Sequence, residues 1–399
     1  MAKKLLADSL GYFQIDNLDV DNWTFKLFSK FSVGLFMVAS AVSVATSYFG
    51  DPIKCLGISN KGYRDTYCWL HGSYHIPNRM LGEQVNKGDD CFRPPYSTKT
   101  DPHDQADTDY YLWVPVMFIL HSFIFMVPDR IWKHYEGGVM AEFISEKEKS
   151  TDDAEKHARF FKTLTKNHNN RYFLTFVFCE LLNLISAVIN FFIIDRFFSG
   201  NFVAYGKKVL QYYFYRETLE AVRVTYTGTN NDQTYMDVRI NPMCSAFPTL
   251  VSCNVETIGS AGGKVIENHI CILAQNLIYE KIYLLFWFWF IILFVASVFN
   301  LMYRLLATIL PVFRKRRLQS VLRSRNFKKL EDLRIIDENI YGIGGWFILC
   351  QIGRNSSPYY FRRLLNEVAK THYKGKYSNL NDMERGDFDT LDMKQKMRG

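Results

Sequence analysis

The chain has 399 residues, of which 48% are hydrophobic and 16% aromatic, and its formal net charge is +8 at pH 7. Its mean hydropathy of -0.11 is that of a soluble protein, but the average conceals apolar blocks long enough to cross a membrane. These blocks exclude an ordinary soluble globular protein. The basic residues gather beside one such block, at 304–330, which argues against a nucleic-acid-binding protein.

The chain is predicted to begin with a short amphipathic segment over residues 1–29. Asp8 and Asp16 alternate there with leucine, phenylalanine and isoleucine, a pattern that suits a surface helix or a segment lining an opening. The first membrane span is predicted over 30–49. Its many small and hydroxylated residues favour close helix packing, and a face toward a water-filled pore is the alternative.

The second span is predicted over 110–132. Tyr110 to Val127 contains no Asp, Glu, Lys or Arg, and tyrosine and tryptophan at its ends are typical of the membrane interface. Pro115 is expected to bend this helix because proline removes a backbone N–H. His121 lies near the middle of the span.

The third span, over 172–194, contains one charged residue, Glu180. A carboxylate in a span does not face lipid. Hydrogen bonding between helices is favoured over direct contact with a permeating ion, since polar groups hold membrane helices together. A pair between Glu180 and His121 is a further hypothesis.

The segment 195–280 is predicted to be rich in β-structure. VRVTYTG and TYMDVRI flank the turn cluster TNNDQ and predict a hairpin. GSAGGK is predicted to be a flexible turn, because its spacing does not fit a phosphate loop. The fourth span follows over 281–303, and the tail over 304–399 is predicted to be helical with a disordered polar end.

The distribution of basic residues predicts the orientation. Nine Lys or Arg and no acidic residue lie between 304 and 330, so this side is predicted to be cytoplasmic. The termini and the loop over 133–171 are therefore expected inside, and the loops over 50–109 and 195–280 outside.

Cysteine usage agrees with this topology. Three of the eight cysteines lie in each outer loop, which predicts disulfides in an oxidising compartment. Six cysteines allow fifteen pairings, so the connectivity stays open at this point. Zinc binding is the weaker alternative because there is no C-x-x-C motif. The six residues are Cys55, Cys68, Cys91, Cys244, Cys253 and Cys271.

No catalytic motif is present. The chain has no G-x-S-x-G, H-E-x-x-H, Walker A or dinucleotide-binding sequence, so we predict no enzymatic activity, no cofactor and no metal site. Disulfides would give two otherwise irregular outer loops a fixed shape, which is useful for recognising something outside the cell.

Several motifs in the same order resemble those of the innexins, the invertebrate gap-junction family related to pannexins. The resemblance covers about residues 25–370, and Leu112 departs from the usual family signature YYQWV. The motifs are GDPIKC at Gly50–Cys55, YCW-x4-Y-x2-P at Tyr67–Pro77, YYLWVP at Tyr110–Pro115, C-x17-C ending at Cys271, EKIYLLFWFWFI at Glu280–Ile291 and GGWFILCQIGRN at Gly344–Asn355.

This resemblance implies an all-α membrane protein: a four-transmembrane-helix bundle with disulfide-braced α/β extracellular loops and a helical cytoplasmic dome. It implies homo-oligomeric hemichannels, octameric in the best-known members, at the plasma membrane. These dock head to head across a cell-cell junction, with other innexins as further partners and membrane lipids around them. The implied disulfides are Cys55–Cys271 and Cys68–Cys253, and a third, Cys91–Cys244, is predicted for the remaining outer cysteines.

The resemblance also implies which residues line the path. The N-terminal segment, span one and the start of the first outer loop make Asp8, Asp16, Asp51 and Lys54 pore-lining candidates, although each also suits an ordinary surface charge. Pro115 becomes a candidate gating element in span two. Conduction would be diffusion through a wide pore.

Two other functions stay open. An undocked release channel is one, and the absence of an N-x-[ST] sequon from both outer loops favours docking over it. A four-span adhesion or scaffold protein is the other, and it is weakened because the CCG motif of tetraspanins and the claudin pattern are both missing.

Overall fold

A computed structural model of the chain describes residues 21–57, 61–75, 79–81, 106–140, 166–215, 222–227, 233–238, 241–259, 262–324, 338–357, 360–361, 363–365 and 368. The predicted N-terminal segment up to residue 20 and the predicted disordered end lie outside this part. The chain forms two compact units. The terminal unit comprises Met1–Lys26, Pro128–Leu182 and Val298–Gly399, and the disulfide unit comprises Leu27–Val127 and Asn183–Ser297.

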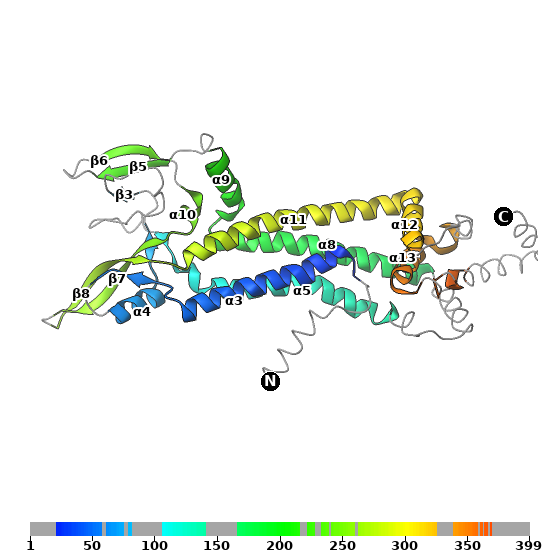
Figure 1. The fold of residues 1–399 in the computed structure, drawn as a ribbon, viewed down its shortest axis with the longest axis horizontal. Helices are drawn as coiled ribbons and strands as arrows, with labels where there is room; N and C mark the ends of the chain where they lie inside the picture. The colour runs from blue at the N-terminus through cyan, green and yellow to red at the C-terminus, as the bar shows by residue number, and fades with distance from the viewer. Residues whose placement is uncertain are drawn as a thin grey trace, which may run out of the picture. The chain divides into compact units, whose positions relative to one another are not determined.

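Four helical segments of the described chain are long and apolar enough to cross a membrane, as four spans are predicted (Figure 1). Helices suit this role because every backbone hydrogen bond is made within the segment. The segments are Trp23–Phe49, Val114–Glu136, Asn169–Phe197 and Asn276–Ile309. The last helix extends beyond the predicted end at 303, which places Arg304 inside it.

The first of these segments is built from three pieces, α2 (Trp23–Phe25), the π-helix η1 (Lys26–Ser32) and α3 (Val33–Phe49). Asn22 caps α2, since its side-chain oxygen accepts a hydrogen bond from the Phe25 N–H at 2.9 Å. Within η1 the Ser32 hydroxyl donates to the Leu27 carbonyl five residues earlier, at 2.9 Å. The other spans are α5 (Val114–Glu136), α8 (Lys166–Phe197) and α11 (Asn276–Ile309).

The disulfide unit contains a five-stranded sheet in the order β1-β8-β7-β2-β4. Its centre is a long antiparallel hairpin whose register pairs Leu250 with Ile272. The hairpin turns where the GSAGGK turn is predicted, and Gly262 has a φ of 77° there, a conformation that favours glycine. The strands are β1 (Lys54–Cys55), β2 (Tyr74–His75), β4 (Ala106–Asp107), β7 (Leu250–Ile258) and β8 (Lys264–Ile272).

A second sheet, in the order β3-β5-β6, confirms the hairpin predicted around TNNDQ. β5 (Val222–Thr227) and β6 (Gln233–Val238) pair antiparallel, and β3 (Arg79–Leu81) adds to β5 in parallel. Three helices were not predicted from the sequence: α4 (Lys61–His71), α9 (Phe202–Phe214) and α10 (Pro242–Ala246).

Aromatic side chains form the interior of the disulfide unit between its helices. Phe36 of α3 stacks on Phe286 of α11 with ring centroids 4.1 Å apart. It also contacts Phe118 and Phe125 of α5, at 6.1 and 5.7 Å. Such rings bury a large apolar area, and their packing sets the spacing of the helices.

In the terminal unit, α12 (Pro311–Ser324) and α13 (Glu338–Asn355) confirm the predicted helices of the tail within the described residues. Pro311 opens α12 at a position where proline is tolerated. The interior of the unit is aromatic: the Phe176 ring lies 4.7 Å from Trp132 and 4.8 Å from Phe347. Gly344 of α13 lies against the backbone of Asn169, where a Cβ atom would come within 2.1 Å of the carbonyl oxygen.

Candidate functional site

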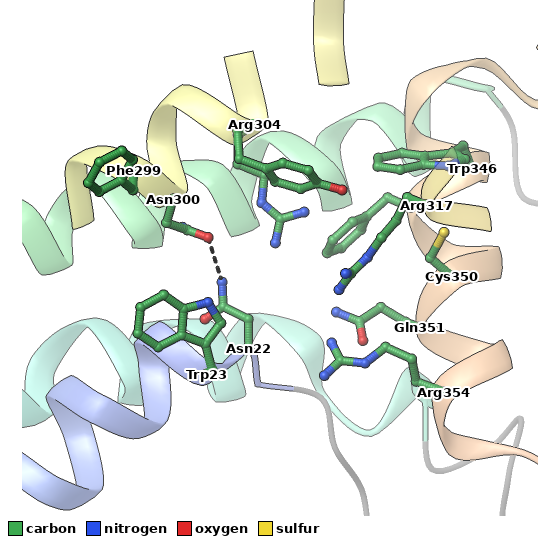
Figure 2. A pocket seen from close by; sticks show the side chains of 12 residues that line it. Asn22, Trp23, Phe299, Asn300, Arg304, Arg317, Trp346, Cys350, Gln351 and Arg354 are labelled. Carbon is green, nitrogen blue, oxygen red and sulfur yellow. Dashed lines mark hydrogen bonds between the residues drawn. The ribbon is translucent and has the colours of Figure 1, made fainter. Parts of the chain in front are cut away.

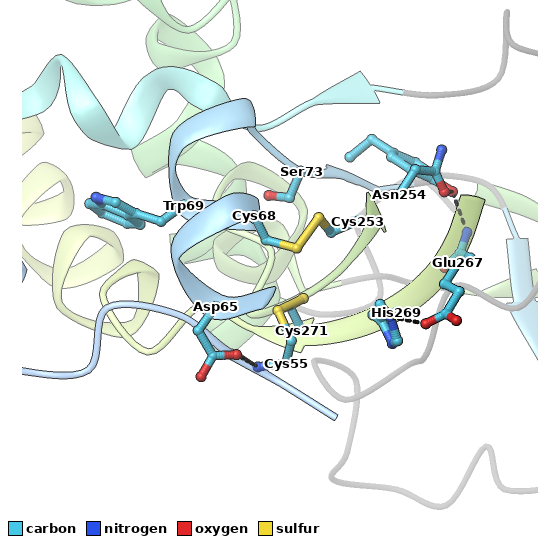
Figure 3. The surroundings of a disulfide bond; sticks show 12 residues. Cys55, Asp65, Cys68, Trp69, Ser73, Cys253, Asn254, Glu267, His269 and Cys271 are labelled. Atoms are coloured by element: carbon cyan, nitrogen blue, oxygen red, sulfur yellow. Dashed lines mark hydrogen bonds and ion pairs between the residues drawn. A yellow bond between two sulfur atoms is a disulfide. The ribbon is translucent and has the colours of Figure 1, made fainter. Parts of the chain in front are cut away.

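Two disulfides join the two loops of the disulfide unit (Figure 3). Cys55 bonds to Cys271 and Cys68 to Cys253, the same two pairs that the resemblance implies. Cys55 and Cys271 are register partners on β1 and β8, whereas Cys68 lies on α4 and reaches β7. The four side chains are buried, and the two bridges fasten β1 and α4 to the hairpin.

Hydrogen bonds and ring stacking position α4. The Asp65 carboxylate accepts a hydrogen bond from the Cys55 N–H at 2.9 Å, which fixes β1 against the helix. Trp69 stacks on Tyr111 at 4.4 Å, and the Tyr111 hydroxyl donates to the carbonyls of Cys68 and Trp69. The segment before α5 thereby holds the same helix as the disulfides.

The sulfur atoms of Cys55, Cys68 and Cys271 lie within 4.8 Å of one another, the spacing of a metal site. All three are oxidised in disulfides, however, which removes the thiolates that zinc requires. Cys244 is also disulfide-bonded. Because Cys91 lies outside the described residues, the Cys91–Cys244 pair stays a prediction.

Two of the pore-lining candidates form an exposed ion pair at the start of the first loop. The Lys54 ammonium lies 2.8 Å from the Asp51 carboxylate, and the side chains are 54% and 70% exposed. The hydrogen bond and the negative charge of Asp51 raise the pKa of Lys54 above its usual value. Asp8 and Asp16 lie outside the described residues.

The tip of the β7–β8 hairpin carries exposed apolar side chains. Ile258 is 83% and Ile266 62% exposed, an exposure that suits contact with another surface. Beside them, Lys264 and Glu256 form an ion pair across the two strands at 2.5 Å. The hairpin thus offers apolar and charged groups on a support braced by disulfides.

Pro115 lies at the start of its helix and not inside it, and a bend at this proline stays a prediction. Helix α5 begins at Val114, so Pro115 is its second residue, where the missing N–H would have no partner in the helix anyway. The proline inside this helix is Pro128. The Pro115 carbonyl accepts a hydrogen bond from Ser40 of α3 at 3.0 Å, and a gating role for Pro115 stays untested.

In the terminal unit, Glu180 of α8 forms a buried ion pair with Arg304 of α11. The Arg304 Nε lies 3.1 and 3.0 Å from the two carboxylate oxygens, and Nη2 lies 3.0 Å from Oε1. Asn22 also donates to Glu180 through its side-chain amide. The Arg304 guanidinium further lies over the ring of Phe176 at 5.0 Å. These contacts hold α8, α11 and the start of α2 together.

The predicted pair between Glu180 and His121 is therefore wrong. In the disulfide unit, His121 of α5 shares a hydrogen bond with Asn190 of α8, with 2.7 Å between Nδ1 and Oδ1. Sequence reasoning missed Arg304 because the span was ended at 303. The signal was present: Asn300 and Arg304 are four residues apart, so they share one face of a helix that continues past that point.

Comparisons with known proteins agree on one family. The innexin family model matches residues 21–372. Innexin inx4 of Drosophila melanogaster is 29% identical over 364 residues, which cover 90% of this chain and 93% of that protein. Innexin inx2 of the same species is 28% identical over 369 residues, covering 90% and 93%. Innexin shaking-B of Drosophila melanogaster is 27% identical over 368 residues, covering 89% and 91%. The chain therefore belongs to the innexins, a family of gap-junction channel proteins.

Proposed function

We propose that this chain is the subunit of a plasma-membrane channel that connects two cells. Subunits of this chain, eight in the expected assembly, form a hemichannel around a wide pore. Two hemichannels from neighbouring cells dock through their outer loops, and ions and small metabolites diffuse through. The termini and the loop at 133–171 face the cytoplasm. Membership of a gap-junction channel family and the four span candidates support this proposal.

The observation that carries the proposal is the shared sheet of the two loops. β1 and β2 come from the loop before α5, β7 and β8 from the loop before α11, and two disulfides lock them together. Docking requires that many copies present the same surface at once. A flexible loop would have to be ordered at each contact, and that conformational entropy opposes binding. A pre-shaped surface avoids most of this cost.

The exposed hairpin tip supports docking as the use of this surface. Isoleucines at Ile258 and Ile266 lose contact with water when a partner covers them, which favours association. The neighbouring ion pair of Glu256 and Lys264 adds charges that select the register of the contact. The other outer loop begins with Asp51 and Lys54, which we assign to the pore entrance.

Dual voltage clamp on paired cells that express this chain alone tests the proposal, with single cells recorded in parallel. Junctional current in pairs, and its absence when only one cell of the pair expresses the chain, is the expected result. Current in single cells without junctional current would replace docking by an undocked release channel. Silence in both settings, with protein at the surface, would contradict a homomeric channel.

A further inference from the structure

A cavity of about 280 Å³ lies within the terminal unit (Figure 2). The end of α11, the middle of α12 and one face of α13 form its walls, together with the two residues at the start of α2. Its volume is at the lower end of those of small-molecule sites. The residues that line it are Asn22, Trp23, Phe299, Asn300, Tyr303, Arg304, Arg317, Trp346, Phe347, Cys350, Gln351 and Arg354.

The cavity wall is strongly basic. The guanidinium groups of Arg304, Arg317 and Arg354 point into the same space, with the carboxamide of Gln351 beside them. No Asp or Glu is among the described residues that line it. Glu180 contacts Arg304 from outside the lining, so the lining itself carries a net positive charge.

The thiol of Cys350 indicates how closely the arginines gather. Burial raises the pKa of Cys350 to about 12, and the positive charges of Arg317, Arg304 and Arg354 all act against that rise. Three arginines thus act on one thiol. Because Glu180 already pairs with Arg304, an anion in the cavity would be attracted mainly by Arg317 and Arg354.

The opposite side of the cavity is aromatic. Trp23 and Phe299 lie across from Arg317 and Arg354, and their side chains are 58% and 70% exposed (Figure 2). Trp346 lines the basic side and is held by a hydrogen bond from its indole N–H to the Arg314 carbonyl at 3.0 Å. The cavity therefore has the exposed rings of Trp23 and Phe299 at one side and guanidinium groups, with Trp346 beside them, at the other.

This arrangement defines the ligand. Planar guanidinium groups match the oxygens of a phosphate and form charge-assisted hydrogen bonds to it. The exposed rings offer contact to an apolar or ring-shaped group attached to that phosphate. A bare inorganic phosphate would use the basic side and leave the aromatic side empty.

We propose that this cavity binds a phosphate ester with an apolar or ring portion, its phosphate against Arg317, Arg354 and Gln351 and the remainder against Trp23 and Phe299. Two sources supply this chemistry, an anionic membrane phospholipid and a soluble nucleotide. The proposal goes beyond the channel function and does not depend on it, because it concerns binding to the terminal unit.

The test measures binding to the full-length protein purified in detergent. The probes are dioctanoyl phosphatidylinositol bisphosphate, ATP and inorganic phosphate, with dioctanoyl phosphatidylcholine as the zwitterionic control, and microscale thermophoresis reports the Kd. The variant is R317Q/R354Q. R316Q is its matched control, because Arg316 is the neighbouring exposed residue of α12 and does not line the cavity. Gel filtration verifies that each variant keeps the wild-type assembly.

Binding of the bisphosphate lipid or of ATP, about tenfold or more weaker in R317Q/R354Q and unchanged in R316Q, is the expected result. Which of the two binds identifies the source. If inorganic phosphate bound as tightly as the esters, the proposed contact of the ligand with Trp23 and Phe299 would be wrong. The proposed site would be wrong if the wild type, R317Q/R354Q and R316Q bound the ligand equally well. It would also be wrong if the wild type bound neither the bisphosphate lipid nor ATP. If R317Q/R354Q fails to assemble, R317K and R354K, which keep the charge but lose the planar fork, provide the same comparison.

Discussion

The two units of this chain join distant segments by different means. In the disulfide unit, residues as far apart as Cys55 and Cys271 are linked covalently and lie side by side in one sheet. In the terminal unit, Glu180 and Arg304 are joined by a buried ion pair surrounded by aromatic rings. Among the described residues, Cys179 and Cys350 are free thiols, and both lie in the terminal unit.

This difference indicates different tolerance for change. A covalent link does not dissociate in an oxidising compartment, which suits a surface that must keep one shape. An ion pair held by hydrogen bonds can be rearranged by a competing charge, and the basic cavity beside Arg304 offers a place for one. We therefore expect fixed recognition from the disulfide unit and adjustable behaviour from the terminal unit.

The largest effect should follow from removing a disulfide of the disulfide unit. In C55S/C271S, β1 is no longer fastened to β8, and loss of a native disulfide costs roughly 2–5 kcal/mol. We expect junctional current in paired cells to fall to background, with surface protein quantified by biotinylation. C179A is the control, since it removes a thiol that forms no disulfide, and it should retain current. Wild-type current in C55S/C271S would show that the sheet holds its form without this bond.

The next largest effect concerns the ion pair of the terminal unit. In E180A, Arg304 keeps its charge but loses its carboxylate partner in a site where Glu180 is 1% and Arg304 12% exposed. An uncompensated buried charge costs about 3–5 kcal/mol. We expect the Tm of the purified protein to fall clearly in E180A and in R304M.

The double variant E180A/R304M completes this cycle. Its Tm should lie above that of either single variant, because no isolated charge is left. If the decreases in Tm were strictly additive, Glu180 and Arg304 would act independently. The ion pair would then not be what joins the distant segments of the terminal unit.

Parts of the fold followed from local sequence patterns. Uncharged apolar runs predicted the four helices because the bilayer thickness sets their length. Alternating residues around TNNDQ predicted the β5–β6 hairpin, since side-chain period and turn residues are local signals. The two disulfide pairs came from the family resemblance alone, because the residues by themselves left fifteen pairings open.

Other features depend on contacts that local patterns do not contain. Pro115 was expected inside a helix because its surroundings are apolar, but the helix begins only at Val114. Glu180 was paired with His121 because both are polar groups in spans. Its true partner, Arg304, was read as a flanking charge. The arginines of the basic cavity come from α11, α12 and α13, and their convergence requires the tertiary fold.

A smaller effect should come from noncovalent packing inside the disulfide unit. A Cβ atom on Gly206 of α9 would lie 2.1 Å from Cδ2 of Trp287 on α11, so G206A forces the two helices apart. Overpacking of this kind costs about 1–3 kcal/mol, and we expect a moderately lower Tm. The control is G62A, where a Cβ atom meets nothing within 4 Å. An unchanged Tm in G206A would mean that the disulfides alone determine the stability of this unit.

The smallest effect on stability, and the clearest on selectivity, is expected at Asp51 and Lys54. Both side chains are exposed, so neither D51N nor K54Q should change the Tm measurably. If the pair lines the pore, D51N should shift the reversal potential in a salt gradient toward lower cation preference, and K54Q should shift it in the opposite direction.

The pKa of Lys54 adds a condition on pH. Since Asp51 raises this pKa above 10.5, Lys54 is charged from about pH 6 to about pH 9. Any stability from this contact is present below the ordinary lysine pKa and is lost only as the pH rises through the raised value. Selectivity that depends on Lys54 should therefore stay constant over this range, and D51N/K54Q should resemble the wild type. If the wild type, D51N, K54Q and D51N/K54Q all had the same reversal potential, Asp51 and Lys54 would not line the pore. The disulfide unit would then serve recognition alone.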